Sequence, residues 1–496
     1  MTKRSKTPSY VIELEARVTS ADLHRIKKKQ EISRCIYNAC LGHLEKAWRG
    51  LQADPVRKSC LAELRRLNAI AKPSKEDKGR RIRVQQRLNK VAVQYGFTEF
   101  CLHEFAAEQK RHFHNAVGIN EVQKIATRAW LAMQKVITGE ARRVHYLCRG
   151  EAVTVENKTN TTGLRVNGQT FIWGKNVSAK LKVGRGDKYA EDTFTDTTKF
   201  CRVRTKTIRG KERVFVQLVK KGTPPSKGKE KSNPEGTVTF DLGPSAIAMY
   251  SPTSHEAEII PLAADIGLES IEDEIARLEK KISRSLRLNN PHALDENGAF
   301  IKGIRLEKSN RCLKLLGRVA ELRRQLAARR KASHEALANR VLEHGDDVRT
   351  EDHGVVGWGR RAKKTRKRRK DGKICSKRRF GRSLQNRAPA MFRRIVGRKL
   401  EGKGRKLVMV PTVKVKASQY DPFTDTYTKH DLSVRWFMIN GSIVQRDLFS
   451  AFLLSHTVGP NFDKVDREAC KADWQNFLNA QSVALRNAGI AVPAQI

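Results

Sequence analysis

The sequence predicts a multidomain α+β protein, because three successive stretches differ in their pattern of apolar residues. Over residues 21–147 the apolar residues recur at helical spacing. From about residue 150 to residue 225, short alternating runs typical of β-strands follow. From residue 236 onward strand and helix patterns alternate, which is typical of an α/β domain. A chain of 496 residues can hold roughly two to four such domains.

The first half of the chain contains one strand and then a helical block. Residues 9–19 alternate between apolar and polar side chains, which predicts a strand, and Ser20-Ala-Asp22 offers a helix start. Residues 120–137 predict an amphipathic helix. Residues 71–81 are polar and basic, so we predict a linker there. The strand at 9–19 can join the later β-rich region, in which case the helical block is an insertion.

The β-rich region ends in a linker. Its predicted strands are residues 152–155, 168–173, 200–208 and 214–219. The last two strands are separated by Arg-Gly-Lys-Glu-Arg, a hairpin signal. The segment that follows is rich in Pro, Gly and Lys, and it predicts a domain boundary with a linker at residues 226–235.

The C-terminal half predicts an α/β domain with a helical hairpin inserted between its strands. Asn289-Asn-Pro separates two long helical patterns, so the hairpin insertion is expected over residues 265–345. Another helix is expected after Asp447. The predicted strands are residues 236–241, 246–251, 256–261, 346–351 and 407–411.

The charge of the chain indicates a polyanionic partner. There are 99 Lys and Arg residues against 52 Asp and Glu, a formal net charge of +47, and such an excess favours nucleic acid. A ribosomal or membrane-surface protein is the alternative. Ribosomal proteins are usually shorter, and no apolar run approaches the ~18 residues of a membrane span. The nine cysteines form no CxxC pair, and no secretory signal is present. We therefore expect a cytoplasmic, prokaryotic protein associated with the nucleoid through DNA.

Three carboxylates stand at the ends of predicted elements: Asp241 ends a strand, Glu351 ends another, and Asp447 begins a helix. Carboxylates brought together from such positions can hold two divalent cations, Mg²⁺ or Mn²⁺. A pair of cations stabilises both the attacking and the leaving oxygen of a phosphodiester. The predicted catalytic and metal-binding residues are therefore these three acids, and the predicted activity is that of a metal-dependent nuclease.

Each acid also has a simpler interpretation. Asp241 can be a turn residue before Gly243, Glu351 is followed by Asp352 and His353 as competing groups, and Asp447 can serve only the helix dipole. The order Asp, Glu, Asp on strand, strand and helix favours a shared site. The strand-Asp-Leu-Gly-hairpin arrangement around Asp241 is typical of the opening of RNase H-like nuclease folds.

A basic run follows Glu351 in the sequence. A run of this kind is usually a solvated, disordered segment or a localisation signal. Its place between two candidate catalytic elements favours binding of a nucleic-acid backbone. The residues predicted to bind are Lys363, Lys364, Arg366, Lys367, Arg368, Arg369, Lys370, Arg378 and Arg379.

Several segments resemble TnpB-like proteins, the transposon-associated RNA-guided nucleases related to compact type V CRISPR effectors. The resemblance is strongest over about residues 236–455, and Asn157-Lys-Thr-Asn-Thr-Thr-Gly is also similar. The segments that carry it are Thr239-Phe-Asp-Leu-Gly-Pro-Ser-Ala-Ile-Ala, Val348-Arg-Thr-Glu-Asp, Val413-Lys-Val-Lys-Ala-Ser-Gln-Tyr, Leu432-Ser-Val-Arg-Trp and Gln445-Arg-Asp-Leu.

The resemblance implies a domain plan. A wedge-type β-barrel would comprise residues 1–20 and 148–225, with a helical recognition lobe at 21–147. A RuvC nuclease domain with an RNase H-like fold would comprise residues 236–416 and 442–496, with Asp241, Glu351 and Asp447 as its acids. Residues 417–441 would form the element that loads the target strand.

The chain departs from the family in that last element. TnpB-like proteins usually carry a four-cysteine zinc ribbon there, and residues 417–441 contain no cysteine, so we expect no zinc. We hypothesise that Tyr420, Phe423, Trp436 and Phe437 replace the metal as its core. A second departure is Gln445, where the family often has an acid.

The function implied is that of an RNA-guided DNA endonuclease. Guide RNA pairs with double-stranded target DNA beside a short motif read by the protein, and the RuvC centre cuts. Two alternatives stay open: a guided DNA-binding protein that silences without cutting, and a guide-independent RNase H-like resolvase. The sequence gives no membrane partner, and it leaves open the oligomeric state and whether the context is a transposon or a CRISPR locus.

Overall fold

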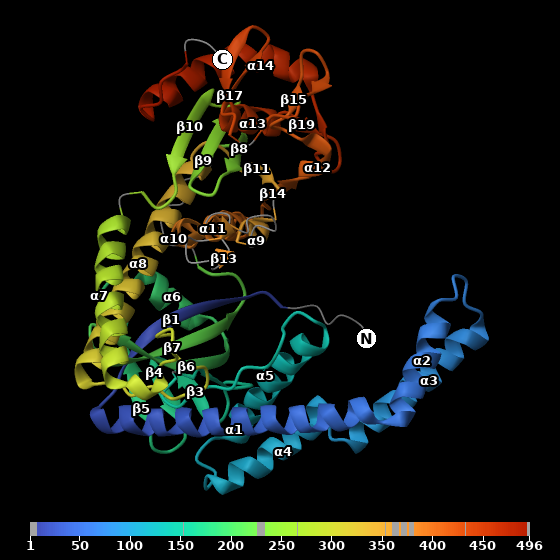
Figure 1. Cartoon of the computed structure of the whole chain (residues 1–496), viewed down its shortest axis with the longest axis vertical. Helices are drawn as coiled ribbons and strands as arrows, with labels where there is room; N and C mark the ends of the chain where they lie inside the picture. Colours follow the sequence, from blue (N-terminus) through green and yellow to red (C-terminus); the bar gives the residue numbers. More distant parts are fainter. Residues whose placement is uncertain are drawn as a thin grey trace. The chain divides into compact units, whose positions relative to one another are not determined.

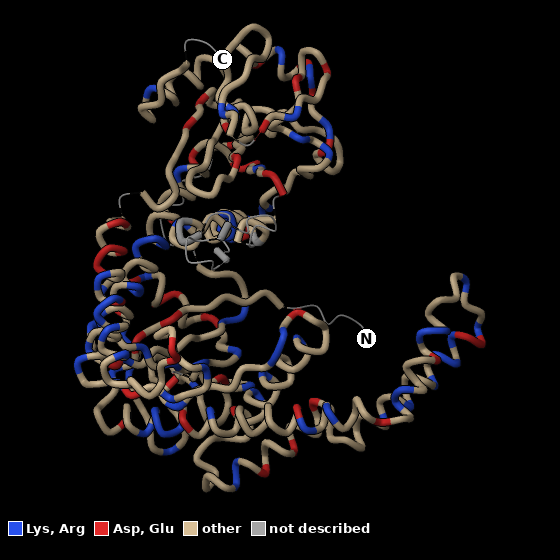
Figure 2. Tube along the Cα trace, viewed as in Figure 1, with Lys and Arg blue, Asp and Glu red and all other residues tan. Residues whose placement is uncertain are grey.

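The computed structural model describes residues 7–151, 153–225, 234–264, 266–352, 354–359, 367–368, 374–375, 381–431 and 433–493. The chain divides into two compact units, Met1–Glu230 and Lys231–Ile496, and Lys and Arg are spread along both (Figure 2). The boundary falls within residues 226–235, most of which lie outside the described residues. The prediction of a multidomain protein of mixed α and β structure is confirmed.

Unit 1 contains a seven-stranded antiparallel sheet in the order β2-β6-β7-β1-β5-β4-β3 (Figure 1). The N-terminal strand β1 lies inside this sheet, because it pairs with β7 from Ser9↔Lys221 to Ala16↔Val214 and with β5 on its other side. The strands are β1 Ser9–Arg17, β2 Val155–Glu156, β3 Leu164–Asn167, β4 Thr170–Trp173, β5 Ser178–Leu181, β6 Thr198–Ile208 and β7 Lys211–Lys221.

The sheet curls around one apolar cluster that includes Phe171, Trp173 and Val216. Its end strand β3 comes back against β6, so the sheet approaches a barrel, although no hydrogen-bonded ladder closes it among the described strands. A short helix, α6 Lys188–Thr195, lies between β5 and β6 and was not predicted. Its start is fixed by Asp187, which accepts a hydrogen bond from the backbone N–H of Ala190 at 3.0 Å.

Five helices lie between β1 and β2, so the helical block is an insertion into the sheet domain. The first begins where the sequence predicts, because Thr19 and Asp22 form a capping box in which Thr19 Oγ1 accepts from the N–H of Asp22 at 3.1 Å. The helices are α1 Ser20–Ala53, α2 Pro55–Asn68, α3 Lys75–Gln94, α4 Glu99–His112 and α5 Ile119–Ile137.

The prediction of a linker at residues 71–81 is wrong, since α3 Lys75–Gln94 begins within this range. Ser74 and Asp77 form a second capping box, with Ser74 Oγ accepting from the N–H of Asp77 at 3.0 Å. High polarity therefore marks an exposed helix here, because only Val84 and Val91 of α3 are buried.

Unit 2 is built on a five-stranded sheet in the order β10-β9-β8-β11-β14 (Figure 1). β9 runs antiparallel to both β8 and β10, whereas β8, β11 and β14 are parallel. All five strands match predicted runs within two residues at either end. They are β8 Thr237–Leu242, β9 Ala246–Ser251, β10 Glu256–Pro261, β11 Asp347–Glu351 and β14 Val408–Val410.

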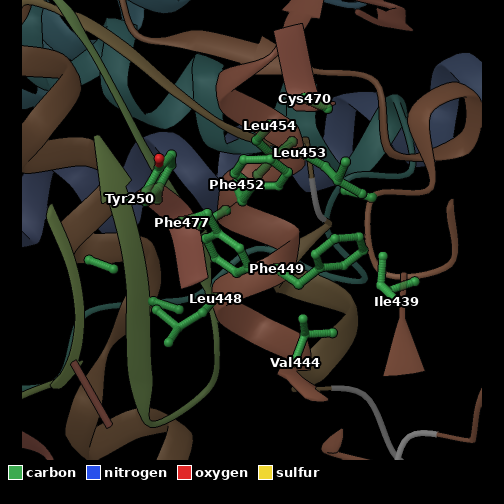
Figure 3. Packing of buried hydrophobic residues seen from close by; sticks show 14 of the residues in the cluster. Tyr250, Ile439, Val444, Leu448, Phe449, Phe452, Leu453, Leu454, Cys470 and Phe477 are labelled. Carbon is green, nitrogen blue, oxygen red and sulfur yellow. The ribbon is translucent and has the colours of Figure 1, made fainter. Parts of the chain in front are cut away.

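Helices cover both faces of this sheet. On one face lie α13 Arg446–Ser455 and α14 Arg467–Asn487, whose aromatic side chains pack against Tyr250 of β9 (Figure 3). On the other face α11 Pro389–Glu401 packs with the C-terminal part of α8 against Phe240 and Val348. α7 Leu268–Asn289 and α8 Asn310–Leu342 form the predicted helical hairpin, joined through the 3₁₀ turn Pro291–Ala293. The helices α11 and α14 were not predicted.

Short elements connect these layers. They are α9 Val355–Trp358, β12 Lys367–Arg368, β13 Ile374–Cys375, α10 Gly381–Arg387, α12 Thr412–Val415, β15 Tyr420–Asp421, β16 Thr426–Tyr427, β17 Trp436–Ile439, β18 Ser442–Gln445, β19 Thr457–Val458 and β20 Lys464–Val465. None of the helices within the described part of the chain is both long and apolar enough to cross a bilayer.

The aromatic residues of segment 417–441 pack onto the main core. The ring of Phe437 lies 5.6 Å from that of Phe449 on α13, and the ring of Phe423 lies 5.1 Å from that of Trp474 on α14. Tyr420 and Trp436 belong to the same apolar cluster. These side chains thus give the segment a core without cysteines, but they share it with the sheet domain instead of enclosing a separate one.

The packing of α13 predicts which apolar side chains hold unit 2 together. Phe449 is fully buried among rings of α13 and α14. Phe449→Ala should lower the free energy of unfolding of this unit by about 3–5 kcal/mol, because it leaves a cavity. Val413→Ala is the control, since Val413 is 82% exposed, and it should change stability by less than about 0.5 kcal/mol. Urea unfolding measures both, and equal effects would contradict this assignment of the core.

Candidate active site

Asp241 and Glu351 stand at equivalent positions on neighbouring parallel strands. The register of β8 and β11 runs from Thr237↔Asp347 to Phe240↔Thr350, so the next residue of each strand is one of the two acids. Neighbouring strands lie about 4.8 Å apart. The carboxyl ends of both strands therefore bring Asp241 and Glu351 side by side at one edge of the sheet.

Both acids lie on the sheet face that α13 covers. Two residues earlier on each strand, Thr239 Oγ1 donates to the carbonyl of Ala451 at 2.6 Å and Arg349 donates to the carbonyl of Thr457 at 2.7 Å. Because side chains alternate along a strand, Asp241 and Glu351 share the face of Thr239 and Arg349. Glu351 is only 6% exposed, and Asp241 is partly buried.

Asp447 reaches the same edge from the first turn of α13. Ala451, which contacts Thr239, lies one helical turn after Asp447, a rise of about 6 Å. Asp241 lies two residues beyond Thr239 on β8, a similar distance of about 6.6 Å. Electrostatics agree with this placement: burial raises the pKa of Asp447, and the negative charge of Asp241 raises that pKa further.

Two neighbours orient the Asp447 carboxylate. Gln445 caps α13, since its Oε1 accepts from the N–H of Leu448 at 2.8 Å, and its Nε2 donates to Asp447 Oδ2 at 3.2 Å. Arg435 Nη1 lies 3.2 Å from the same oxygen. Gln445 thus serves both as the cap of α13 and as a hydrogen-bond donor to Asp447.

Sequence reasoning did not identify Arg435 as part of this site. The residue belongs to Leu432-Ser-Val-Arg-Trp, one of the segments that carry the resemblance. An arginine in a motif close before a candidate acid was therefore the available signal. Its pairing with Asp447 depends on the β17–β18 hairpin, which brings Trp436 opposite Gln445.

Glu351 has a better position for chemistry than its neighbour Asp352. Asp352 is exposed, and its backbone N–H donates to the carbonyl of Val410 at 2.8 Å. Because consecutive residues of an extended chain point in opposite directions, the two carboxylates diverge. His353 lies outside the described residues.

The three carboxylates suit a hard cation chemically, although their side chains do not surround a common metal position. Within the described residues, no group of three or more His, Cys, Asp and Glu side chains lies close enough to hold a metal ion. Three carboxylates on one face and at one edge are nevertheless the oxygen ligands that Mg²⁺ prefers. Burial first, and then the negative charge of Asp241, raise the pKa of Asp447, and a cation bound between the two acids would lower it again.

The predicted nucleic-acid-binding run is described only in fragments. Lys367 and Arg368 form β12, which pairs with Ile374 and Cys375 of β13. The other residues of the prediction lie outside the described residues: Lys363, Lys364, Arg366, Arg369, Lys370, Arg378 and Arg379. The role of this run stays a prediction.

Comparisons with known proteins give only distant structural likeness. No family model matches the sequence, and no curated protein matches it. A chain from a cryo-EM structure of a Cas12f1–sgRNA–target DNA complex is similar, with a TM-score of 0.42 and 11% identity over 90% of this chain and 98% of that one. A chain from a CRISPR–Cas12f ternary complex has a TM-score of 0.23 and 11% identity over 91% of this chain and 87% of that one.

The dual role of Gln445 can be tested by its removal. Gln445→Ala removes the N-cap acceptor of α13 and should lower the free energy of unfolding by about 0.5–2 kcal/mol. Gln475→Ala on α14 is the control, because Gln475 is exposed and its loss should cost less than about 0.5 kcal/mol. Thermal or urea unfolding distinguishes them. If both variants kept wild-type stability, Gln445 would not be a structural cap.

Proposed function

We propose that the chain is an RNA-guided, metal-dependent DNA endonuclease whose nuclease centre consists of Asp241, Glu351 and Asp447. The observation that carries the chemistry is the convergence of three acids, far apart in sequence, at one edge and on one face of the sheet of unit 2. The β8–β9 hairpin, which returns directly beside Asp241, supports the expected RNase H-like opening.

The residues of the site divide the work between them. Asp241, Glu351 and Asp447 would hold the cations, Mg²⁺ or Mn²⁺. When bound, two such ions activate water and stabilise the leaving oxygen of a phosphodiester. Glu351 is buried, and Gln445 and Arg435 orient Asp447 and offset part of its charge. The positive N-terminal end of α13 also lies beside Asp447, which stabilises its charged form.

The guide RNA and the DNA target enter the proposal from the sequence. The segments around all three acids resemble TnpB-like proteins, and the net charge of +47 suits a protein that neutralises many phosphates. The curled sheet and inserted helices of unit 1 are elements of the kind that the resemblance implies for holding guide and target. On this proposal base pairing supplies specificity, and the protein supplies backbone contacts.

Two observations favour the alternative of a guided protein that binds without cutting. Asp447 is paired with Arg435, and the described acids do not form a finished metal cage. A cation therefore has to compete with the Arg435 guanidinium for the Asp447 carboxylate. The two functions differ in whether the RNA-bound protein cuts a matching DNA or only binds it.

The first test is to purify the protein expressed together with its native flanking DNA, sequence any bound RNA, and assay cleavage of a matching plasmid with Mg²⁺. We expect a discrete RNA and metal-dependent cutting. Loss of a residue that only hydrogen-bonds to a metal ligand typically lowers activity by about 10- to 100-fold. Asp241→Asn and Glu351→Gln change ligands themselves, so they should lower the cutting rate by more than that. Both variants should keep RNA and target binding.

Asp352→Asn is the matched control, since it removes one negative charge from the adjacent exposed position, and it should cut at close to the wild-type rate. A discrete RNA with target binding but no cutting by the wild type would establish the silent binder. Cutting without any bound RNA would leave the resolvase, and equal losses in Asp352→Asn and Glu351→Gln would reject the assignment of Glu351.

A metal-binding test needs neither RNA nor cleavage. At a Mg²⁺ concentration about a hundred times the dissociation constant, binding to the folded state should stabilise unit 2 by about 2.7 kcal/mol. Asp241→Asn and Asp447→Asn should lose this shift in melting temperature. Asp463→Asn should keep it, because Asp463 pairs with Lys414 at 2.7 Å. A Mg²⁺ shift that persists in all three variants would place the cation elsewhere.

A further inference from the structure

Unit 2 has a second charged site, on the sheet face opposite the three acids. A groove of about 500 Å³ lies between α11 on one side and, on the other, β14 with the loop that leads into it. Residues from both sides line it, among them Arg393, Arg394, Gly397, Lys406, Leu407 and Met409. None of these residues belongs to the candidate active site.

The helix α11 has three faces, and only one of them borders the groove. Phe392, Val396 and Leu400 are buried against the sheet. Arg398 and Lys399 pair with Glu335 of α8, Lys399 at 3.3 Å. The third face carries the groove-lining residues of the helix, and Glu401 stands at its far end.

Gly397 leaves the middle of this face open. A Cβ atom built at Gly397 would meet no atom within 4 Å, so the space above this turn of the helix is not filled by the protein. Glycine weakens a helix interior, and here its lack of a side chain coincides with the lining of the groove. A ligand can therefore approach the backbone of α11 between the arginines and Glu401.

The chemistry of the groove suits a phosphate chain. Residues 389–410 contain seven Lys and Arg against one Glu, and four of the seven cations lie on α11. Exposed cations stand on both walls, Arg394 on the helix and Lys406 on the loop, while Leu407 and Met409 add apolar surface. Arginine suits phosphate because its planar fork can donate two hydrogen bonds, and apolar side chains suit a sugar or a base.

We propose that this groove binds the phosphodiester backbone of a single nucleic-acid strand. Its volume is that of a small-molecule pocket, which holds a nucleotide or two of one strand and not a duplex. The inference relies on the proposed function only for the class of partner. It involves none of the three acids, so binding in the groove and cleavage can fail separately.

The test measures binding of fluorescent single-stranded oligo-dT and oligo-U to the full chain over a range of salt concentrations, in an Asp241→Asn background that prevents cutting. Each phosphate contact contributes about 0.7 to the slope of log affinity against log salt for a single strand. Arg394→Gln and Lys406→Gln should each lower the slope by about that amount. Arg398→Gln is the matched control, because it removes the same charge from the α8-facing side of the same helix.

A second variant separates the groove from net charge. Gly397→Leu places a side chain into the open space without changing charge, and it should weaken binding while the melting temperature does not fall. The proposal is overturned if Gly397→Leu binds normally, or if Arg398→Gln changes the slope as much as Arg394→Gln.

The two probes identify the source of the strand. Effects confined to oligo-U point to RNA, effects confined to oligo-dT point to DNA, and effects on both indicate recognition of the backbone alone. If the wild type fails to cut DNA but these slopes change as expected, the groove stands and the nuclease proposal falls. If cutting occurs and the slopes do not change, the nuclease proposal stands and the groove is not a binding site.

Discussion

The docking of α13 on the five-stranded sheet, where it packs against β8, β9 and β11, is the constraint on which unit 2 depends. Eight consecutive residues of this ten-residue helix, Leu448–Ser455, are buried. Packing on all sides therefore restricts both the position and the rotation of the helix. The hydrogen bond from Thr239 to the carbonyl of Ala451 fixes its height along β8. A shift of α13 by one turn would move Asp447 by about 5.4 Å and separate it from Asp241. The apolar core therefore also sets the geometry of the acids.

The fold places the Asp447 carboxylate where burial and a neighbouring negative charge both oppose its ionisation. Burial and the charge of Asp241 both raise the pKa of Asp447, so the ionised form is disfavoured in the folded protein. Folding therefore binds a proton at Asp447 more tightly, and the stability contributed there falls as pH rises through the raised pKa. Arg435, Gln445 and the end of α13 offset part of this cost. A carboxyl group whose pKa is perturbed by burial and by a specific charged neighbour is a candidate for a functional site.

Sequence patterns predicted the five strands of the main sheet of unit 2 well, because they are short runs bounded by turn residues, whereas the two- to four-residue strands outside that sheet were not predicted. Asp241 and Glu351 were found because they stand at the ends of two of those runs, and Asp447 because it begins a helical run. Their register was not predictable, since it depends on which residues of β8 and β11 pair. Arg435 was missed because its contact with Asp447 arises from the turn between β17 and β18. The helix α3 was missed because it has too few apolar residues to show a helical repeat in the sequence. Ser74 and Asp77, which form its capping box, were the available signal for its start.

The edge strand β14 connects the two charged sites of unit 2. Its residues alternate between faces, so Val410, which pairs with Glu351, packs on the α13 side, and Met409 lines the groove beside α11. β14 is the last strand of the sheet, hence no further strand separates the two faces at this edge. In the pairing of β11 with β14, Met409 stands opposite Thr350 and Val410 opposite Glu351. The groove and Glu351 are therefore one residue apart along this pairing, on opposite faces of the sheet.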